Sequence, residues 1–416
     1  MHANCVALDH FKRVPRCSSF MRQPRTLHIK HVVMKKNLNQ KASTKDFHSY
    51  PWWSPRFWHG MPMRVWFDLV RQNHWKIAPS RLGLLGTISA ASCFNSTAES
   101  LCKARFRRQL ASPPDTGPPL FIIGHWRSGT TLLHEILMLD DRFCCPSTYQ
   151  CFAPGHFLLT EAFLTTALAW IMPAKRPMDN VAAGWHRPQE DEFALVNMGA
   201  ASPYRRMAFP NTMPSEPTAL DLESLTAKEL AQWKDLLRKF IAMLAIRDAR
   251  RPILKSPTHT ARMAVLASMF PGARFLHIVR DPFVVFPSTK RLWNSLHHVQ
   301  SMQIDSEENA EEYVFQCFDT MYSAFERDRA QLNPGQLHEI HYEELVANPV
   351  SSMEKAYEKL DLGGFDKVRP AFEEQAESMK GYTTNTYQHD ARIVSEISQR
   401  WQPFIQRYGY KQPPVS

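Results

Sequence analysis

The chain reads Gly124-His125-Trp126-Arg127-Ser128-Gly129-Thr130-Thr131 between the apolar run Leu120–Ile123 and the helical pattern Leu132–Leu139. A strand, a tight glycine-rich turn and a helix, in this order, direct free backbone N–H groups at an anion. The pattern therefore predicts a phosphate-binding loop at the start of a helix.

This loop departs from the P-loop pattern GxxxxGK[ST] at one position. Gly124 and Gly129 have the required spacing, and Thr131 occupies the final hydroxyl position. Thr130 replaces the lysine, while a cation stands three places earlier as Arg127. Kinases and ATPases use that lysine together with Mg²⁺ to neutralise a pair of terminal phosphates. The loop therefore predicts a donor with less charge, such as one phosphate bonded to a sulfonate, and no metal site.

Strand-like runs alternate with helical ones along the rest of the chain. Arg251–Leu254 precedes the helical pattern Ala261–Phe270. Arg274–Val279 and Leu337–Tyr342 are further strand-like runs. This alternation predicts an α/β fold in which a P-loop-type parallel sheet is flanked by helices. A Pro-rich joint at residues 112–119 separates this body from the preceding region.

A second motif follows the run Arg274–Val279. It reads His277-Ile278-Val279-Arg280-Asp281-Pro282, and Ser288 follows eight residues after Arg280. A guanidinium group and a hydroxyl at a helix start form a selective clamp for a phosphate. A local ion pair between Arg280 and Asp281 is the alternative interpretation.

With these two motifs the chain resembles the P-loop sulfotransferases, most closely the bacterial-type members whose donor loop reads Gly-His-Trp-Arg-Ser-Gly-Thr-Thr-Leu-Leu. The resemblance extends from about Trp52 to the C-terminus and includes His341-Tyr342-Glu343-Glu344-Leu345. It implies transfer of a sulfonate group from 3′-phosphoadenosine 5′-phosphosulfate (PAPS) to a hydroxyl or amine. It also implies which residues bind the donor: Arg127, Ser128, Gly129, Thr130 and Thr131 at the 5′-phosphosulfate, and Arg280 and Ser288 at the 3′-phosphate.

Sulfonate transfer builds up negative charge on the leaving phosphate oxygen, so the site needs cations there and a base near the acceptor. Arg127 is the first cation by its position. Lys255 ends a strand-like run, and related sulfotransferases have a Lys-Ser element that contacts the donor. We therefore choose Lys255 as the second cation, with an ordinary surface lysine as the alternative.

The sequence contains no family motif for the catalytic base. Many relatives place a Glu or a His soon after the first helix, but residues 147–151 contain neither. The segment Trp185–Phe193 offers Glu190, which we choose. The rivals are His186, Glu192 and His156. Acids in the first turn of a helix also fit a purely structural role, because they complement the helix dipole.

The net charge of +10 is concentrated at the N-terminus. Residues 1–110 hold 19 Lys and Arg against 4 Asp and Glu, a balance of +15 that leaves −5 for the remainder. A basic arm on a slightly acidic body does not resemble a nucleic-acid-binding domain, and we predict no nucleic-acid partner. The expected organisation is a disordered basic arm at residues 1–48, a Trp-rich helical extension at 49–112 and a sulfotransferase domain at 118–416.

Five of the eleven tryptophans lie between Tyr50 and Trp75. In this region Val65, Trp66 and Leu69 have helical spacing, which predicts a helix packed on the main domain, with an interfacial membrane helix as the alternative. Eight cysteines without a CxxC pair indicate a reducing compartment. No signal peptide or spanning segment is evident. We predict a cytoplasmic protein, with peripheral membrane contact through the N-terminal region left open.

The acceptor is a small molecule, a glycan or a lipid, and the apolar segment Tyr149–Phe163 favours a hydrophobic one. Histidine and acid spacings resemble no metal motif, so we predict no metal. Two other functions remain to be tested. A nucleotide kinase on the same sheet would need the missing lysine, and a non-catalytic adaptor would bind the donor product without turnover. The sequence does not predict the oligomeric state.

Overall fold

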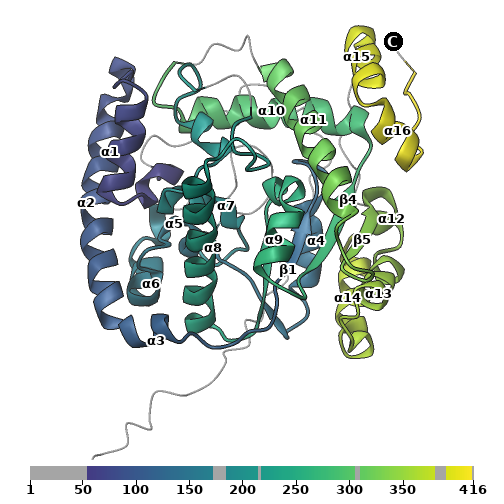
Figure 1. Cartoon of the computed structure of the whole chain (residues 1–416), viewed down its shortest axis with the longest axis horizontal. Helices are drawn as coiled ribbons and strands as arrows, with labels where there is room; N and C mark the ends of the chain where they lie inside the picture. The colour runs from purple at the N-terminus through teal and green to yellow at the C-terminus, as the bar shows by residue number, and fades with distance from the viewer. Residues whose placement is uncertain (1–53, 172–183, 214–216, 305–309, 380–389, 415–416) are drawn as a thin grey trace, which may run out of the picture. The chain divides into compact units, whose positions relative to one another are not determined.

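A parallel sheet carries the central motifs (Figure 1). In the described part of the chain its five strands are ordered β2-β3-β1-β4-β5, and every neighbouring pair is parallel. The strands are β1 (Leu120–Ile123), β2 (Phe143–Cys144), β3 (Arg251–Lys255), β4 (Arg274–Val279) and β5 (Leu337–His341). Helices flank this sheet, which confirms the predicted α/β fold.

The computed structural model describes residues 54–171, 184–213, 217–304, 310–379 and 390–414. The predicted arm at residues 1–48 and the residues Trp52 and Trp53 lie outside these ranges. None of the helices within them is both long and apolar enough to cross a membrane.

The first helices of the described chain precede β3. They are α1 (Met63–Gln72), α2 (Leu82–Arg105), α3 (Arg107–Ala111), α4 (Thr130–Leu137), α5 (Thr148–Phe152), α6 (Phe157–Ala167), α7 (Asp191–Met198) and α8 (Ala227–Arg247). The later helices are α9 (Met263–Met269), α10 (Pro282–Gln300), α11 (Ala310–Arg329), α12 (Tyr342–Ala347), α13 (Pro349–Lys359), α14 (Phe365–Met379), α15 (Ala391–Arg400) and α16 (Gln402–Tyr408).

Alternate residues of the strands enter two separate cores, one on each face of the sheet. In β1, Phe121 and Ile123 belong to the core formed with α8 to α11, whereas Leu120 and Ile122 belong to the core formed with α4, α12, α13 and α14. All four side chains are fully buried. A strand covered on both faces has no polar position, which explains the uninterrupted apolar run.

The N-terminal helices pack onto the larger of these two cores. In α1, Trp66, Leu69 and Val70 are buried and join the core that contains α8 to α11. Just before α1, the indole nitrogen of Trp58 donates to the carbonyl of Gln300 in α10 over 2.7 Å. The predicted helix at this position is confirmed, and its apolar stripe faces protein.

Three adjacent parallel strands end at one edge of the sheet. β1 lies between β3 and β4, and each of the three is followed by a motif identified in the sequence. Because the carboxyl ends of parallel strands meet at the same edge, this strand order brings the donor loop, Lys255 and Arg280 to one edge of the sheet. This edge carries the candidate site.

Candidate active site

Two glycines shape the loop between β1 and α4. Gly124 has φ 144° and Gly129 has φ 107°, values that favour glycine. A Cβ on Gly124 would lie 2.5 Å from the carbonyl oxygen of Ile278, and a Cβ on Gly129 would lie 2.4 Å from the ring of Tyr342. The loop backbone therefore packs closely against β4 and the start of α12. Such a cradle leaves backbone N–H groups to face an anion.

Hydrogen bonds and packing hold this loop in place. The N–H of Gly124 donates to Oγ1 of Thr260 over 2.8 Å. The hydroxyl of Ser128 donates to the carbonyl of His125, also over 2.8 Å. Burial lowers the pKa of His125 to about 4, so the imidazole that packs against Phe318 is neutral at pH 7. The shape of the loop is thus fixed by protein contacts alone.

The second motif meets the donor loop at Arg127. Nε of Arg127 donates to Oγ of Ser288 in α10 over 2.9 Å. Nη1 of Arg280 donates to the carbonyl of Arg127 over 3.1 Å, and its guanidinium lies 4.1 Å from the ring centroid of Tyr342. Two guanidinium groups and a hydroxyl therefore gather beside the glycine cradle. This combination of groups binds phosphates and sulfonates.

Lys255 and Glu190 form an ion pair at the same edge of the sheet. Lys255 is the last residue of β3 and its side chain is 1% exposed, while Glu190 precedes α7 and its side chain is 16% exposed. Nζ of Lys255 donates to Oε1 of Glu190 over 2.9 Å. The surface-lysine alternative is therefore wrong, since this lysine is buried and paired with a carboxylate.

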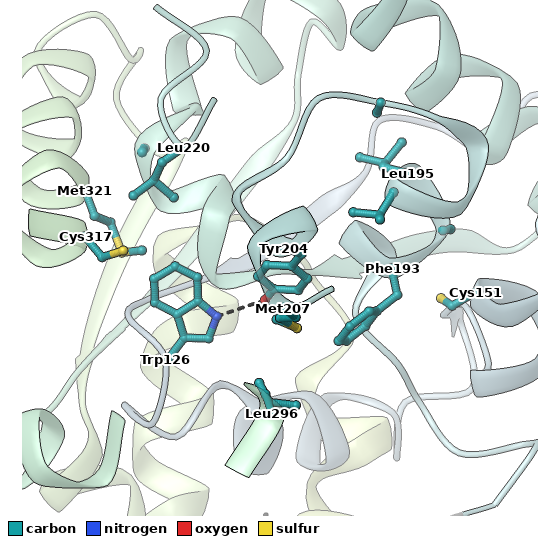
Figure 2. Packing of buried hydrophobic residues seen from close by; sticks show 14 of the residues in the cluster. Trp126, Cys151, Phe193, Leu195, Tyr204, Met207, Leu220, Leu296, Cys317 and Met321 are labelled. Atoms are coloured by element: carbon teal, nitrogen blue, oxygen red, sulfur yellow. Dashed lines mark hydrogen bonds between the residues drawn. The ribbon is translucent and has the colours of Figure 1, made fainter. Parts of the chain in front are cut away.

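Two further side chains connect Glu190 to the donor loop. The hydroxyl of Tyr204 donates to Oε2 of Glu190 over 2.6 Å, and the indole nitrogen of Trp126 donates to the Tyr204 oxygen over 2.9 Å. Figure 2 shows Trp126 and Tyr204 pointing toward each other, with Phe193 on the other side of the Tyr204 ring. A continuous chain of hydrogen bonds therefore runs from Trp126 through Tyr204 and Glu190 to Lys255.

Tyr204 remains a hydrogen-bond donor at neutral pH. Burial, reinforced by the negative charge of Glu190, raises the pKa of its hydroxyl well above the ordinary value. The residue lies on the short 3₁₀ turn η5 (Pro203–Met207), which is started by the side chain of Ser202. Neither Tyr204 nor the side chain of Trp126 is predictable from the sequence, because no spacing rule links either one to Glu190.

Glu192, one of the rival bases, is held in a separate buried ion pair. Nη1 of Arg262 lies 2.7 Å from Oε2 of Glu192, and both side chains are 0% exposed. The hydroxyl of Thr258 donates to the same oxygen over 2.9 Å. A buried carboxylate with these partners stabilises the packing of α7 against the turn that follows β3.

The two rival histidines lie in different surroundings from Glu190. His186 is exposed. His156 is buried, and its ring nitrogens lie 2.9 Å from Oγ1 of Thr160 and 3.1 Å from Oδ1 of Asn95. Burial lowers the pKa of His156 to about 4. The structure brings neither histidine into the hydrogen-bonded chain of Glu190.

Replacing His156 by Gln should change the pH dependence of stability and not the turnover. Because the folded pKa of about 4 is below the ordinary 6.5, the unfolded chain binds the proton first. Its contribution is therefore complete above pH 6.5 and is lost as the pH falls toward 4. Between pH 7 and pH 5 the wild type should lose about 1–2 kcal/mol more free energy of unfolding than the variant, as measured by urea denaturation.

The exposed His186 provides the matched control for that experiment. His186→Gln should leave the difference between pH 7 and pH 5 unchanged. A large loss of turnover in His156→Gln, with its stability intact, would instead assign His156 to the chemistry.

The described residues contain no metal-like cluster. No three His, Cys, Asp or Glu side chains gather as a metal site would require within the described ranges. A hollow of about 570 Å³ lies between α1, α2, α7 and α8, away from Lys255 and Arg127. The charged groups at the strand ends, where the two sequence motifs meet, are the candidate site.

Comparisons with known proteins agree with this geometry. The model of the family described as "Sulfotransferase family" matches residues 118–367. The omega-hydroxy-beta-dihydromenaquinone-9 sulfotransferase Stf3 of Mycobacterium tuberculosis is 36% identical over 358 residues, which cover 86% of this chain and 92% of the relative. The protein of the same name from Mycobacterium bovis matches equally well.

Solved structures with the same fold are also sulfotransferases. Sulfotransferase STF9 from Mycobacterium avium matches with a TM-score of 0.61 at 16% identity, over 85% of this chain and 92% of that one. Sulfotransferase STF1 from Mycobacterium tuberculosis matches with a TM-score of 0.51 at 15% identity, over 82% and 90%. These likenesses support the fold, and the family match and the relatives support the activity. The chain therefore belongs to the sulfotransferase family and is a sulfotransferase, as the sequence predicted.

Proposed function

We propose that this sulfotransferase transfers the sulfonate group of PAPS to the terminal hydroxyl of a prenyl-chain lipid, such as a hydroxylated quinone or quinol. The observation that carries the donor is the contact of Arg127 with Arg280 and Ser288, beside the strand β3 that ends at Lys255. The acceptor class rests on relatives that share 36% identity and whose name specifies an ω-hydroxylated dihydromenaquinone.

The residues of the donor loop fit such a donor. The loop is packed closely at its two glycines, and it is flanked by two arginines in place of the lysine that a terminal phosphate pair needs. The loop residues would bind the 5′-phosphosulfate: Arg127, Ser128, Gly129, Thr130 and Thr131. Arg280 and Ser288 would bind the 3′-phosphate. When bound, the donor supplies a sulfonate attached to a phosphate that leaves readily.

Lys255 and Glu190 would divide the chemistry between the two sides of the sulfonate. Arg127 and Lys255 place positive charge where the departing phosphate becomes negative. Glu190 accepts one hydrogen bond on each carboxylate oxygen, from Lys255 and Tyr204, and keeps lone pairs for a third group. Through one of these it would take the proton of the acceptor hydroxyl. Tyr204 would hold the carboxylate in the orientation for that transfer.

Binding of the donor product 3′-phosphoadenosine 5′-phosphate should depend on both arginines. Losing one charged hydrogen-bond partner costs about 1.5–3 kcal/mol, so Arg127→Ala and Arg280→Ala should each weaken binding about 10- to 100-fold. Isothermal titration calorimetry without metal measures this directly. Arg238→Ala, at an exposed arginine of α8, should bind like the wild type. Binding of ATP with Mg²⁺ in place of the donor product would contradict the proposal.

The acceptor class has its own test. Radioactive sulfur from labelled PAPS should be incorporated into a prenyl quinone that carries a terminal hydroxyl. The same quinone without that hydroxyl is the matched control and should stay unlabelled. Equal labelling of both compounds would assign the reaction to a ring hydroxyl of the reduced quinol form, since the quinone ring itself has no hydroxyl. Labelling of neither would exclude this acceptor class.

A further inference from the structure

Apolar side chains are exposed on the outer sides of two neighbouring helices, α2 and α6. Leu101 of α2 is 58% exposed and Phe163 of α6 is 72% exposed. We define the α2–α6 face by its exposed apolar residues: Phe94, Leu101, Leu159 and Phe163. Single exposed apolar residues are ordinary, but a group on adjacent helices indicates an interaction surface.

The two helices form one continuous surface. The ring of Phe94 lies 5.7 Å from the ring of His156, the residue just before α6. The Cys102 thiol lies against the backbone of Leu159. In Figure 1, α2 and α6 lie together on the side away from α13 and α14. The exposed side chains of both helices can therefore contact one partner surface at the same time.

Each helix turns its acidic residue away from this face. The only acid of α2, Glu99, pairs with Lys103 over 2.7 Å and with Lys239 of α8 over 3.1 Å. The only acid of α6, Glu161, is buried and pairs with Arg247 over 2.8 Å. The exposed part of both helices therefore has no unbalanced negative charge.

Exposed cations border the same face. They follow Leu101 at the end of α2 and in α3: Arg105, Arg107 and Arg108. No acid occurs from residue 100 to residue 114. An apolar helix face bordered by Lys and Arg complements an anionic lipid surface, because the apolar side chains enter the interface and the cations attract the headgroups.

The candidate base is tied to the C-terminal end of α6. The indole nitrogen of Trp185 donates to the carbonyl of Leu168, next to α6, over 3.0 Å. Trp185 is buried and its carbonyl accepts from the N–H of Tyr149 over 2.9 Å. Glu190 follows five residues later. The segment that contains Glu190 is therefore hydrogen-bonded to the end of the helix that carries Phe163.

We infer that the protein docks on an anionic phospholipid bilayer through the α2–α6 face, with the cations of α3 against the headgroups. This surface differs from the segment between Tyr50 and Trp75 that the sequence offered as an alternative membrane helix, since α1 turns its apolar stripe inward. Delivery of a lipid acceptor from that bilayer rests on the proposed function. The docking itself does not, because it can be measured without any acceptor.

Flotation of the full chain with vesicles tests the docking. The wild type should float with vesicles of phosphatidylglycerol and phosphatidylcholine. The double variant Leu101→Ser/Phe163→Ser should partition about tenfold less, because two large apolar side chains no longer enter the bilayer. Arg107→Gln/Arg108→Gln should reduce binding and make it less sensitive to salt. Ile304→Ser, at a residue that is also 72% exposed but lies outside the face, should float like the wild type.

Three results would overturn the inference. The first is a wild type that does not float with anionic vesicles. The second is a double variant that floats as well as the wild type, which would assign binding to other parts of the chain such as residues 1–48. The third is a change of oligomeric state: light scattering would find the wild type to be a dimer and Leu101→Ser/Phe163→Ser to be a monomer. This face would then be a subunit interface.

Activity separates this inference from the proposed acceptor. Both double variants should keep full turnover on a short-chain hydroxylated prenyl quinone in detergent, and should lose turnover on a long-chain acceptor embedded in vesicles. Flotation without labelling of any prenyl quinone would leave the docking intact and reject the acceptor. Labelling without flotation would reject the docking and leave the acceptor intact.

Discussion

Replacing Lys255 by Met should lower kcat for sulfonate transfer about 10³-fold and weaken binding of the donor product by less than about tenfold. Lys255 is buried at the end of β3, where it contributes a positive charge beside the donor loop. A cation that stabilises charge formed only in the transition state affects kcat more than binding. Single-turnover assays with labelled PAPS, together with calorimetry, measure the two effects separately.

Two further variants distinguish this role from simple support of Glu190. Lys255→Arg keeps the charge and should recover part of the activity. Lys255→Met/Glu190→Gln should be slower than either single variant if the two residues act on different sides of the sulfonate, and no slower if they act as one unit. A kcat within threefold of the wild type in Lys255→Met would rule out the assigned role.

Replacing Glu190 by Gln should lower kcat about 10²- to 10⁴-fold with no change in donor-product binding. The amide keeps an oxygen that accepts from Tyr204 or Lys255, so the local structure should persist while the proton acceptor is lost. Steady-state kinetics on wild type and variant provide the measurement.

The rival residues provide matched controls for that result. Glu192→Gln removes a carboxylate two residues away and should mainly destabilise the fold, because Arg262 would be left buried without its charged partner. His186→Asn should have no effect on kcat, since His186 is exposed. The opposite result, with full activity in Glu190→Gln and none in a folded Glu192→Gln, would assign the role of base to Glu192.

Much of the sheet could be predicted because its central strands are buried on both faces. Leu120–Ile123 and Arg274–Val279 have the bounds that the sequence pattern gives. Leu337–Tyr342 ends one residue earlier, since Tyr342 begins α12 and contacts Gly129. The strand Phe143–Cys144 was not predicted, because two residues are too few to form a pattern. Its place beside β3 depends on pairing between residues far apart in the sequence, which a local sequence pattern does not indicate.

The candidate site was predictable only where residues close together in the sequence determine the local backbone conformation. The cradle at Gly124 and Gly129 follows from spacing alone, since both positions need a backbone that glycine adopts. Glu190 was one of four candidates, and its contact with Lys255 joins two segments that are 65 residues apart in the sequence. Tyr204 could not be found, because a buried hydroxyl between two distant segments has no signature in the order of residues.

The hydrogen bonds from Trp126 to Lys255 have a thermodynamic consequence. Trp126 belongs to the loop that would bind the donor, and Glu190 to the segment that would meet the acceptor, with Tyr204 between them. A donor that shifts the indole would also shift the carboxylate, and would so change the affinity for the second substrate. Reciprocity would then require the acceptor to change donor affinity by the same factor. Occupancy of one half of the reaction centre would thereby change the affinity of the other half through a single phenol.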